Sequence, residues 1–459
     1  MSTPSDPAAA GGHRRARESR ALRTTLSAIV ARGFSTAASM ISVPLALTLL
    51  GQDRYGLYVA LTTFVAWGSI ADLGLGNGLT TALATMHGNG DDSGAARAVT
   101  SAFVMITRIT AFMTLACVVA LLVVPWRTVL AVPEGLDDVE VTPSIVVCMS
   151  VLVLGVWLGP LERIYTGFQE GFLANQFQIA GSALSLLALG ATWWLGLGMG
   201  WVVAALALAP MVPRAASVVF MVGVRRPQLM PRREHYDPTV ARSLLSTGVA
   251  FLLPQLASLA MWSTDNAIVL HVSGASAVAT YATVFRLPLL FYSVVTMWVS
   301  PLWPAYAEAR ARGDGEWIMQ THRRTLQRSM GLAAAGALVF AATGGWVVRT
   351  WTLHRIDPAL SLLLADGAWM LVITWCTVHA VALNALERVR GQAYYGMAAA
   401  VVNVALSIYL GRRFGIVGVS WATTVACIVP SVLCWWELRH AFRGLPSDPV
   451  AATSRAERG

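Results

Sequence analysis

The sequence predicts an all-α protein that crosses a membrane about twelve times. Charged residues make up only 12% of the 459 residues, whereas a typical soluble domain has about 25%. Long apolar segments recur from Thr24 to Leu438 with few interruptions. A bilayer core roughly 30 Å thick takes about 20 apolar residues per helix, and backbone groups in that layer must bond within their own segment. The runs are too long for barrel strands and do not alternate, so we expect helices.

Twelve segments reach the length of a membrane helix. The basic stretch before Thr24 resembles the start of a signal peptide. The apolar run after it is too long and has no obvious small-residue cleavage site, so we expect an uncleaved first helix. The first six spans are predicted at residues 24–50, 57–85, 99–124, 143–168, 172–195 and 199–224, and the second six at 241–270, 277–308, 326–349, 358–386, 392–410 and 416–438.

Arginines near the span ends predict the orientation of the chain, because positive residues stay on the cytoplasmic side. The N-terminal tail and the loops around Arg225 and Arg323 are basic, whereas the loop around Asp137 is acidic. Both termini are therefore expected in the cytoplasm, although Arg412 opposes this orientation. The formal net charge of +9 is mostly explained by this topology. The arginines are spread over many loops, so no nucleic-acid partner is predicted.

The two halves of the chain show faint similarity. Since each half has six spans, both point the same way, and a pseudo-two-fold axis along the membrane normal is expected; chance similarity is the alternative. The predicted domains are a basic tail (1–23), a first lobe (24–224), a cytoplasmic linker (225–240), a second lobe (241–439) and a tail (440–459). Gly51 and Tyr58 match Gly274 and Tyr281 at an offset of 223, and Gly171, Gly198, Trp201 and Pro210 match Gly391, Gly418, Trp421 and Pro430 at an offset of 220.

Short motifs of glycine, proline, acidic and aromatic residues accompany these spans. They comprise Gly51, Tyr55 and Gly56; Asp72, Gly74, Gly76 and Gly78; Pro254, Asp265, Gly274, Tyr281, Pro301 and Pro304; and Asn403, Leu406, Gly415, Ile416 and Gly418. In this order and spacing the chain resembles the bacterial polysaccharide (O-antigen or lipopolysaccharide) flippase family. That family belongs to the multidrug/oligosaccharidyl-lipid/polysaccharide exporter superfamily.

The resemblance implies a V-shaped fold of two six-helix lobes around a central cavity. It also implies a function: alternating access would carry undecaprenyl-diphosphate-linked oligosaccharide from the cytoplasmic to the periplasmic leaflet, for cell-surface polysaccharide biosynthesis. The implied location is the bacterial inner membrane. The expected partners are the lipid-linked oligosaccharide, membrane lipids, H⁺ or Na⁺ as a coupling ion, and polysaccharide-assembly proteins.

Three arginines fall well inside predicted spans and are the candidate diphosphate-binding residues: Arg32, Arg108 and Arg286. An arginine at a helix centre costs roughly 2.5–3.5 kcal/mol on insertion, unless water or an anion relieves it. The guanidinium fork matches phosphate oxygens and stays charged. A hydrated, cationic lumen is therefore predicted, with structural pairing of the arginines as the alternative.

Polar residues recur at helical spacing on several spans. Neighbours three and four positions apart share a helix face, so polar faces are expected to line a wet lumen. Hydrogen bonding between packed helices is the alternative. The candidate lining residues are Ser35 and Ser39 on the first span, Asn175 and Gln178 on the fifth, and Gln255 and Ser258 on the seventh.

Two intramembrane aspartates are candidates for ion coupling. Asp265 either binds H⁺ or Na⁺ or forms a structural ion pair with Arg286. Asp72 stands beside glycines, so a role in breaking or capping its helix is equally open. Glu162 stands near a predicted span end and is expected at the interface. His379 is expected to be a buried, hydrogen-bonded imidazole.

Two other functions compete with the flippase hypothesis. An ion-coupled multidrug antiporter of the same superfamily would favour carboxylates in its lumen, whereas the deep charges here are mostly arginines. A membrane-embedded glycan polymerase or glycosyltransferase is disfavoured by the lack of an Asp-X-Asp motif and of a large outer loop. The five cysteines form no Cys-X-X-Cys pair. We therefore predict a transporter without catalytic residues, cofactor or metal site.

Overall fold

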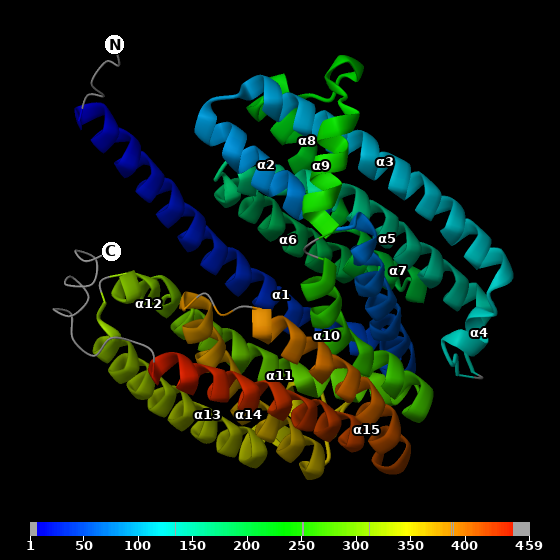
Figure 1. Cartoon of the computed structure of the whole chain (residues 1–459). Coiled ribbons are helices and arrows are strands. Elements are labelled where there is room, and N and C mark those ends of the chain that lie inside the picture. The colour runs from blue at the N-terminus through cyan, green and yellow to red at the C-terminus, as the bar shows by residue number, and fades with distance from the viewer. Residues whose placement is uncertain are drawn as a thin grey trace. The chain divides into compact units, whose positions relative to one another are not determined.

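The computed structural model describes residues 7–133, 135–249, 252–311, 313–386, 388 and 390–443. Side chains are described from residue 26 onward, except at 69, 253, 254, 257, 258, 260–262, 304, 311, 390 and 393. Every regular element in these ranges is a helix, as predicted (Figure 1). The chain divides into two compact units. The first comprises Met1–Gly51 and Phe64–Gln255, and the second comprises Gln52–Thr63 and Leu256–Gly459. Two helices, α1 and α10, therefore each contribute residues to both units.

The first unit contains most of α1 and the helices α2 to α9. The π-helices η2 and η3 alternate with α7 and α8, and together they form one continuous span. The elements are α1 (Pro7–Gly68), η1 (Ser69–Asp72), α2 (Leu75–Asn89), α3 (Asp92–Val123), α4 (Trp126–Val129), α5 (Asp138–Gly167), α6 (Gly171–Leu195), α7 (Met199–Val203), η2 (Ala204–Leu208), α8 (Met211–Phe220), η3 (Met221–Arg225), η4 (Pro227–Leu229), η5 (Arg233–His235) and α9 (Pro238–Val249).

The second unit contains the segment Gln52–Thr63 of α1, most of α10 and the remaining helices. Within it, α14 packs against α11, α12, α13 and α15, so α14 is the central helix. The elements are α10 (Leu252–Ser273), α11 (Ala275–Val299), α12 (Leu302–Ala311), α13 (Gly315–Trp351), α14 (Leu360–Ala385) and α15 (Arg390–Arg443).

Nine helical segments of the described chain are long and apolar enough to cross a membrane. Two of them, Leu26–Asp72 and Tyr394–Arg443, contain 47 and 50 residues, about twice the length of one span. Each is divided by one non-helical residue, Gly51 or Gly415. The chain is thus a multi-pass membrane protein, and its helices agree with the prediction of about twelve spans.

Two glycines matched between the halves adopt the same unusual backbone conformation. Gly51 has φ 71° and ψ 177°, and Gly274 has φ 84° and ψ 175°. Glycine enters this region readily, whereas a residue with a Cβ atom rarely does. Each glycine lies where one predicted span ends and the next begins. The shared geometry supports the predicted repeat.

The second predicted span is interrupted at its middle. Leu73 and Gly74 both have left-handed backbone angles, so the helix stops after η1 and restarts as α2. The backbone N–H of Gly74 donates to the carboxylate of Asp72 at 2.9 Å. Asp72 therefore caps the break, and its role in ion coupling stays a prediction.

Glycines bring α2 and α9 into backbone contact. A Cβ atom added to Gly74 would lie 2.2 Å from the carbonyl oxygen of Gly248, and one added to Gly78 would lie 2.3 Å from that of Leu244. Any larger side chain would push these helices apart. Gly74 and Gly78 thus serve close helix packing.

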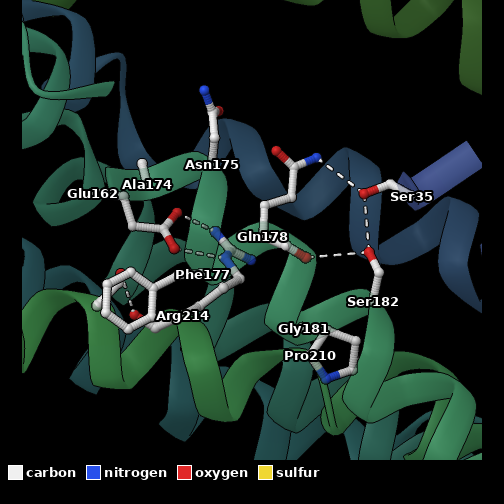
Figure 2. A pocket seen from close by; sticks show the side chains of 11 residues that line it. Ser35, Glu162, Ala174, Asn175, Phe177, Gln178, Gly181, Ser182, Pro210 and Arg214 are labelled. Atoms are coloured by element: carbon white, nitrogen blue, oxygen red, sulfur yellow. Dashed lines mark hydrogen bonds and ion pairs between the residues drawn. The ribbon is translucent and has the colours of Figure 1, made fainter. Parts of the chain in front are cut away.

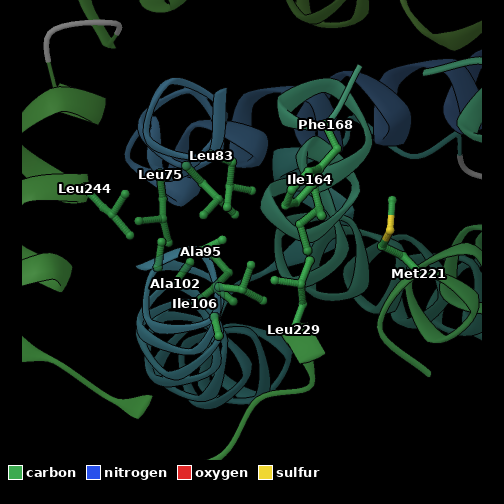
Figure 3. Close-up of a cluster of buried hydrophobic side chains, with 14 of the residues drawn as sticks. Leu75, Leu83, Ala95, Ala102, Ile106, Ile164, Phe168, Met221, Leu229 and Leu244 are labelled. Carbon is green, nitrogen blue, oxygen red and sulfur yellow. The ribbon is translucent and has the colours of Figure 1, made fainter. Parts of the chain in front are cut away.

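A large apolar core joins α2, α3, α5 and α9 within the first unit (Figure 3). Leu75 and Leu83 of α2 lie with Ile106 of α3 and Ile164 of α5 in one fully buried cluster. Leu229 of η4 also belongs to this cluster. The segment predicted as a linker is therefore packed against the helices of the first unit.

A charged cluster fixes the end of this core. The carboxylate of Glu170, with a side chain only 5% exposed, accepts from Arg225 Nε at 3.2 Å and from Arg226 Nη2 at 2.9 Å. The guanidinium of Arg226 lies over the ring of Phe168, 3.9 Å from its centroid. Between η5 and α9, the hydroxyl and backbone N–H of Thr239 donate to Asp237 and hold the pKa of that half-buried carboxyl below its usual value.

The substitution Glu170→Gln is expected to lower the stability of the first unit by about 2–4 kcal/mol, because it leaves two arginines beside a neutral, buried side chain. Thermal unfolding of the purified protein in detergent measures this change. Glu316→Gln, at an exposed glutamate of α13, is the matched control and should leave the unfolding temperature nearly unchanged. Equal unfolding temperatures for both variants would show that the cluster does not stabilise the fold.

Candidate functional site

A cavity with mixed polar and apolar lining lies in the first unit among α1, α5, α6 and α8 (Figure 2). Its volume is ≈ 480 Å³, within the range of small-ligand sites. The α6 face that carries Asn175 and Gln178 supplies much of the lining. That these residues line the predicted lumen stays a prediction. The described lining residues are Ser35, Glu162, Ala174, Asn175, Phe177, Gln178, Gly181, Ser182, Pro210, Arg214 and Ser217.

Hydrogen bonds connect α1 to α6 beside this cavity. The Ser35 and Ser182 hydroxyls are 2.9 Å apart, and Gln178 Nε2 donates to Ser35 Oγ at 3.5 Å. Asn175 Nδ2 donates to Ser27 Oγ at 2.9 Å. Both readings of the polar faces therefore apply here: these side chains line a cavity and also bond between helices.

One ion pair supplies the charge of the cavity. Arg214 of α8 donates through Nε to Glu162 Oε1 and through Nη2 to Glu162 Oε2, each at 2.8 Å. The two side chains are 31% and 25% exposed. Such a bidentate pair is short, directional and strong. Glu162 lines this cavity and pairs with Arg214 of α8, and its expected position at the membrane interface stays a prediction.

The second unit contains a hydrogen-bond network around Asp265, whose side chain is almost completely buried. Thr423 Oγ1 and Tyr281 OH donate to Asp265 Oδ2 at 2.6 and 3.0 Å. Asn403 Nδ2 and Ser407 Oγ donate to Oδ1 at 3.2 and 3.4 Å. These four donors come from α11 and α15, which meet α10 here. Arg286 is not among the described contacts of this carboxylate, so the pairing considered from the sequence is not seen.

A second cavity, of ≈ 320 Å³, opens beside this network. Asp265, Tyr281, Arg286 and Thr423 line it together with Tyr58 of the segment Gln52–Thr63. The structure therefore brings Asp265 and Arg286 to one cavity. A carboxylate, hydroxyls and a half-buried guanidinium face the same space.

Another buried carboxylate stands near Asp265. The Asp366 side chain of α14 is completely buried, and its Oδ1 accepts a hydrogen bond from the hydroxyl of Ser420. Its other oxygen, Oδ2, has no hydrogen-bond partner in the described chain. An intramembrane carboxylate is costly unless it is protonated, paired or solvated. Sequence reasoning missed Asp366, although an acid inside an apolar span was a visible signal.

The three predicted arginines lie in different surroundings. Arg32 is exposed on α1, one turn before Ser35. Arg108 is exposed on α3, with its guanidinium 5.6 Å from the ring centroid of Tyr236. Arg286 lines the second cavity. Their joint role in binding a diphosphate stays a prediction.

The other predicted residues occupy separate positions. Ser39 is half-buried on α1, and Gln255 is half-buried on α10. The side chain of Ser258 lies outside the described residues. His379 is buried, with Nδ1 2.8 Å from the carbonyl oxygen of Trp375, as expected. Its ring also meets that of His322 edge to face.

Arg214, Asn403, Ser407 and Thr423 were not predicted as site residues. The sequence alone does not reveal their roles, because each residue contacts a partner on another helix that is far away in the chain. Glu162 and Arg214 are 52 residues apart, and Asp265 and Thr423 are 158 apart. Asn403 had a visible signal, because it belongs to a motif that carried the family resemblance.

Comparisons with known proteins place this geometry in context. No family model matches the chain. A protein named "Putative O-antigen transporter" from Salmonella typhi is 21% identical over 419 residues, covering 87% of this chain and 90% of that protein. "Probable flippase AglR" from Haloferax volcanii is 25% identical over 190 residues, covering 41% of this chain and 40% of that protein. These names agree with the prediction of a transporter rather than an enzyme.

Solved structures show the same fold. An inward-facing multidrug resistance MATE family transporter of the MOP superfamily has a TM-score of 0.74 at 15% identity, covering 91% of this chain and 98% of that one. A MOP superfamily transporter from Pyrococcus furiosus has a TM-score of 0.63 at 15% identity, covering 94% and 96%. The chain therefore has the fold of the MOP superfamily. Its predicted resemblance to the flippases of that superfamily is confirmed by the relatives named as an O-antigen transporter and a flippase.

Proposed function

We propose that the chain is a flippase for an oligosaccharide linked through a diphosphate to a polyisoprenyl lipid such as undecaprenol. It acts in the bacterial inner membrane, with both termini in the cytoplasm, and moves the glycan head to the periplasmic leaflet by alternating access. The observation that carries this proposal is the charge state of the cavity in the first unit. Its carboxylate, Glu162, is neutralised by Arg214, and hydroxyls and amides supply the other polar groups.

This lining suits a sugar better than a drug cation. A cation exporter can bind its substrate through an unpaired carboxylate in the lumen, whereas both carboxylate oxygens of Glu162 already accept hydrogen bonds from Arg214. Sugar hydroxyls both donate and accept, as do the amides and hydroxyls of Gln178, Ser35 and Ser182. The exposed Arg32, one turn along α1 from Ser35, adds a cation that suits the diphosphate. The relatives named as an O-antigen transporter and a flippase support the same choice.

Reconstitution tests the proposal directly. Liposomes that contain the protein receive a fluorescent lipid-diphosphate oligosaccharide or a fluorescent drug cation, and the transfer of each is followed with a membrane-impermeant quencher. We expect transfer of the glycan lipid only. Arg32→Ala should slow glycan transfer by about tenfold, the loss expected for one charge-assisted contact. Transfer of the drug cation alone would replace the flippase by the multidrug antiporter.

We also propose that Asp265 couples transport to an ion gradient. Asp265 Oδ1 and Oδ2, Asn403 Oδ1, Ser407 Oγ and Thr423 Oγ1 are linked by hydrogen bonds of 2.6–3.4 Å. Hard cations prefer oxygen ligands, and these five oxygens lie beside a single nitrogen, Asn403 Nδ2, which donates to Asp265 Oδ1. A proton on the carboxyl would suit the same network. The adjoining cavity supplies a path for either ion.

A further inference from the structure

The cavity of the first unit is lined by both apolar and polar side chains. Phe177 contributes an aromatic ring to the lining, and this ring packs against that of Phe220, with centroids 5.9 Å apart. Glu162, Arg214 and Gln178 contribute polar groups to the same lining (Figure 2). An aromatic face against a C–H surface, with bidentate polar groups at the edge, matches the chemistry of a pyranose ring.

The ion pair makes the cavity favour an uncharged sugar over an acidic one. Among the described lining residues, Glu162 and Arg214 are the charged ones, and they neutralise each other through two hydrogen bonds of 2.8 Å. An acidic sugar entering here would bring its carboxylate close to Glu162, and no described lining residue offers an unpaired cation to it, because Arg32 stands outside the lining. An uncharged sugar keeps the ion pair intact and still hydrogen-bonds to its outer edges. Like charges brought together out of water repel strongly.

We propose that this cavity is a subsite for an uncharged sugar residue of the transported glycan, and that Glu162 makes it selective by masking the charge of Arg214. This inference rests on the proposed flippase function and narrows its substrate class. Gln178 hydrogen-bonds to the sugar directly, and Phe177 stacks against it. Glu162 acts through Arg214 and is a positioning residue.

Equilibrium binding of lipid-free sugars tests the subsite independently of transport. The full-length protein in lipid nanodiscs is titrated with maltotetraose, and with maltotetraose oxidised to a uronate at its terminal residue. We expect the wild-type protein to bind the neutral sugar about tenfold more tightly, the preference that about 1.4 kcal/mol of repulsion gives. Equal affinities, or no binding of either sugar, would overturn the inference.

The charge variants sharpen the test. Glu162→Gln keeps the shape of the side chain but leaves the Arg214 charge unmasked, so the preference should reverse in favour of the uronate. The double variant Glu162→Gln/Arg214→Gln should lose this reversal. An unchanged preference in Glu162→Gln contradicts the masking role.

A second substitution keeps the inference testable if the charge variants do not fold. Gln178→Ala should weaken neutral-sugar binding about tenfold, because it removes a hydrogen-bonding amide from the cavity. Gln320→Ala, on α13 of the second unit, is the matched control and should bind like the wild type. Equal affinity of these two variants would exclude Gln178 from the subsite. If these sugar preferences hold but the protein does not transfer lipid-linked glycan in liposomes, the flippase proposal fails and the sugar site stands. If the protein transfers the glycan but shows none of these sugar preferences, only the subsite is rejected.

Discussion

Replacing Asp265 by asparagine is expected to abolish the dependence of transport on an ion gradient. The carboxylate accepts four side-chain hydrogen bonds in a site that is almost completely closed to solvent. Asparagine has nearly the same shape but cannot take up a proton or supply two anionic oxygens to a cation. The NH2 group of the asparagine would also face hydrogen-bond donors that now donate to the carboxylate. The gradient-driven rate should therefore fall at least about tenfold, since charge-assisted hydrogen bonds contribute about 1.5–3 kcal/mol each.

The measurement is glycan-lipid transfer in liposomes, with and without an imposed proton or sodium gradient. Asn266→Ala is the matched control, because Asn266 neighbours Asp265 and lines the same cavity but donates to Thr63 rather than to the carboxylate. The control should keep its gradient dependence. If the Asp265→Asn protein still responds to the gradient as the wild type does, Asp265 is not the coupling residue.

A third variant separates the two ions. Thr423→Val keeps the volume but removes the hydroxyl that lies 2.6 Å from Asp265 Oδ2. For a sodium site, this removes one ligand oxygen and should weaken Na⁺ stimulation by about tenfold. For a proton site, the carboxyl can still titrate, so the response to a pH gradient should persist. The same liposome assay, run at fixed pH with varied Na⁺ and then at fixed Na⁺ with varied pH, distinguishes these outcomes.

The parts of this molecule that follow from local sequence were predictable. Helix lengths follow from apolar runs, because a bilayer fixes how many residues a span needs. The match between Gly51 and Gly274 predicted a repeat, and the two glycines share a backbone conformation that excludes most other residues. Asp265 was recognisable because an acid inside an apolar span is costly. Asn175 and Gln178 were placed on one face by helical spacing alone.

The partners of these residues depend on which helices pack together, and that information is not local. Glu162 is the clearest case: its position near a span end gave no sign of its ion pair with Arg214 on another helix, or of the cavity that both side chains line. Asp366 finds Ser420 only because α14 and α15 pack side by side. The lumen predicted from Arg32, Arg108 and Arg286 likewise depends on tertiary arrangement rather than on helical phase.

The segment Gln52–Thr63 makes unusually close contact within the second unit. Gly56 is buried, and a Cβ atom there would lie 1.6 Å from the carbonyl oxygen of Ala275 at the start of α11. One turn earlier, the amide oxygen of Gln52 accepts from the hydroxyl of Ser276 at 2.7 Å, and its amide group donates to the carbonyl of Arg355. Only a glycine lets the backbone approach this closely.

Gly56→Ala is therefore expected to destabilise the second unit by about 3 kcal/mol, the upper part of the usual range for overpacking a rigid contact. Gly88→Ala on α2 is the matched control, because its Cβ would meet nothing within 4 Å and alanine favours a helix by about 1 kcal/mol over glycine. Thermal unfolding followed with a thiol-reactive dye measures both variants, since Cys148, Cys427 and Cys434 are buried until the protein unfolds.

Gly56→Ala should also weaken gradient-driven transport, because Tyr58, Val59 and Thr62 of the same segment line the cavity beside Asp265. Equal unfolding temperatures for the two variants would mean that the segment can shift without cost, and that its contact with α11 does not position the coupling site.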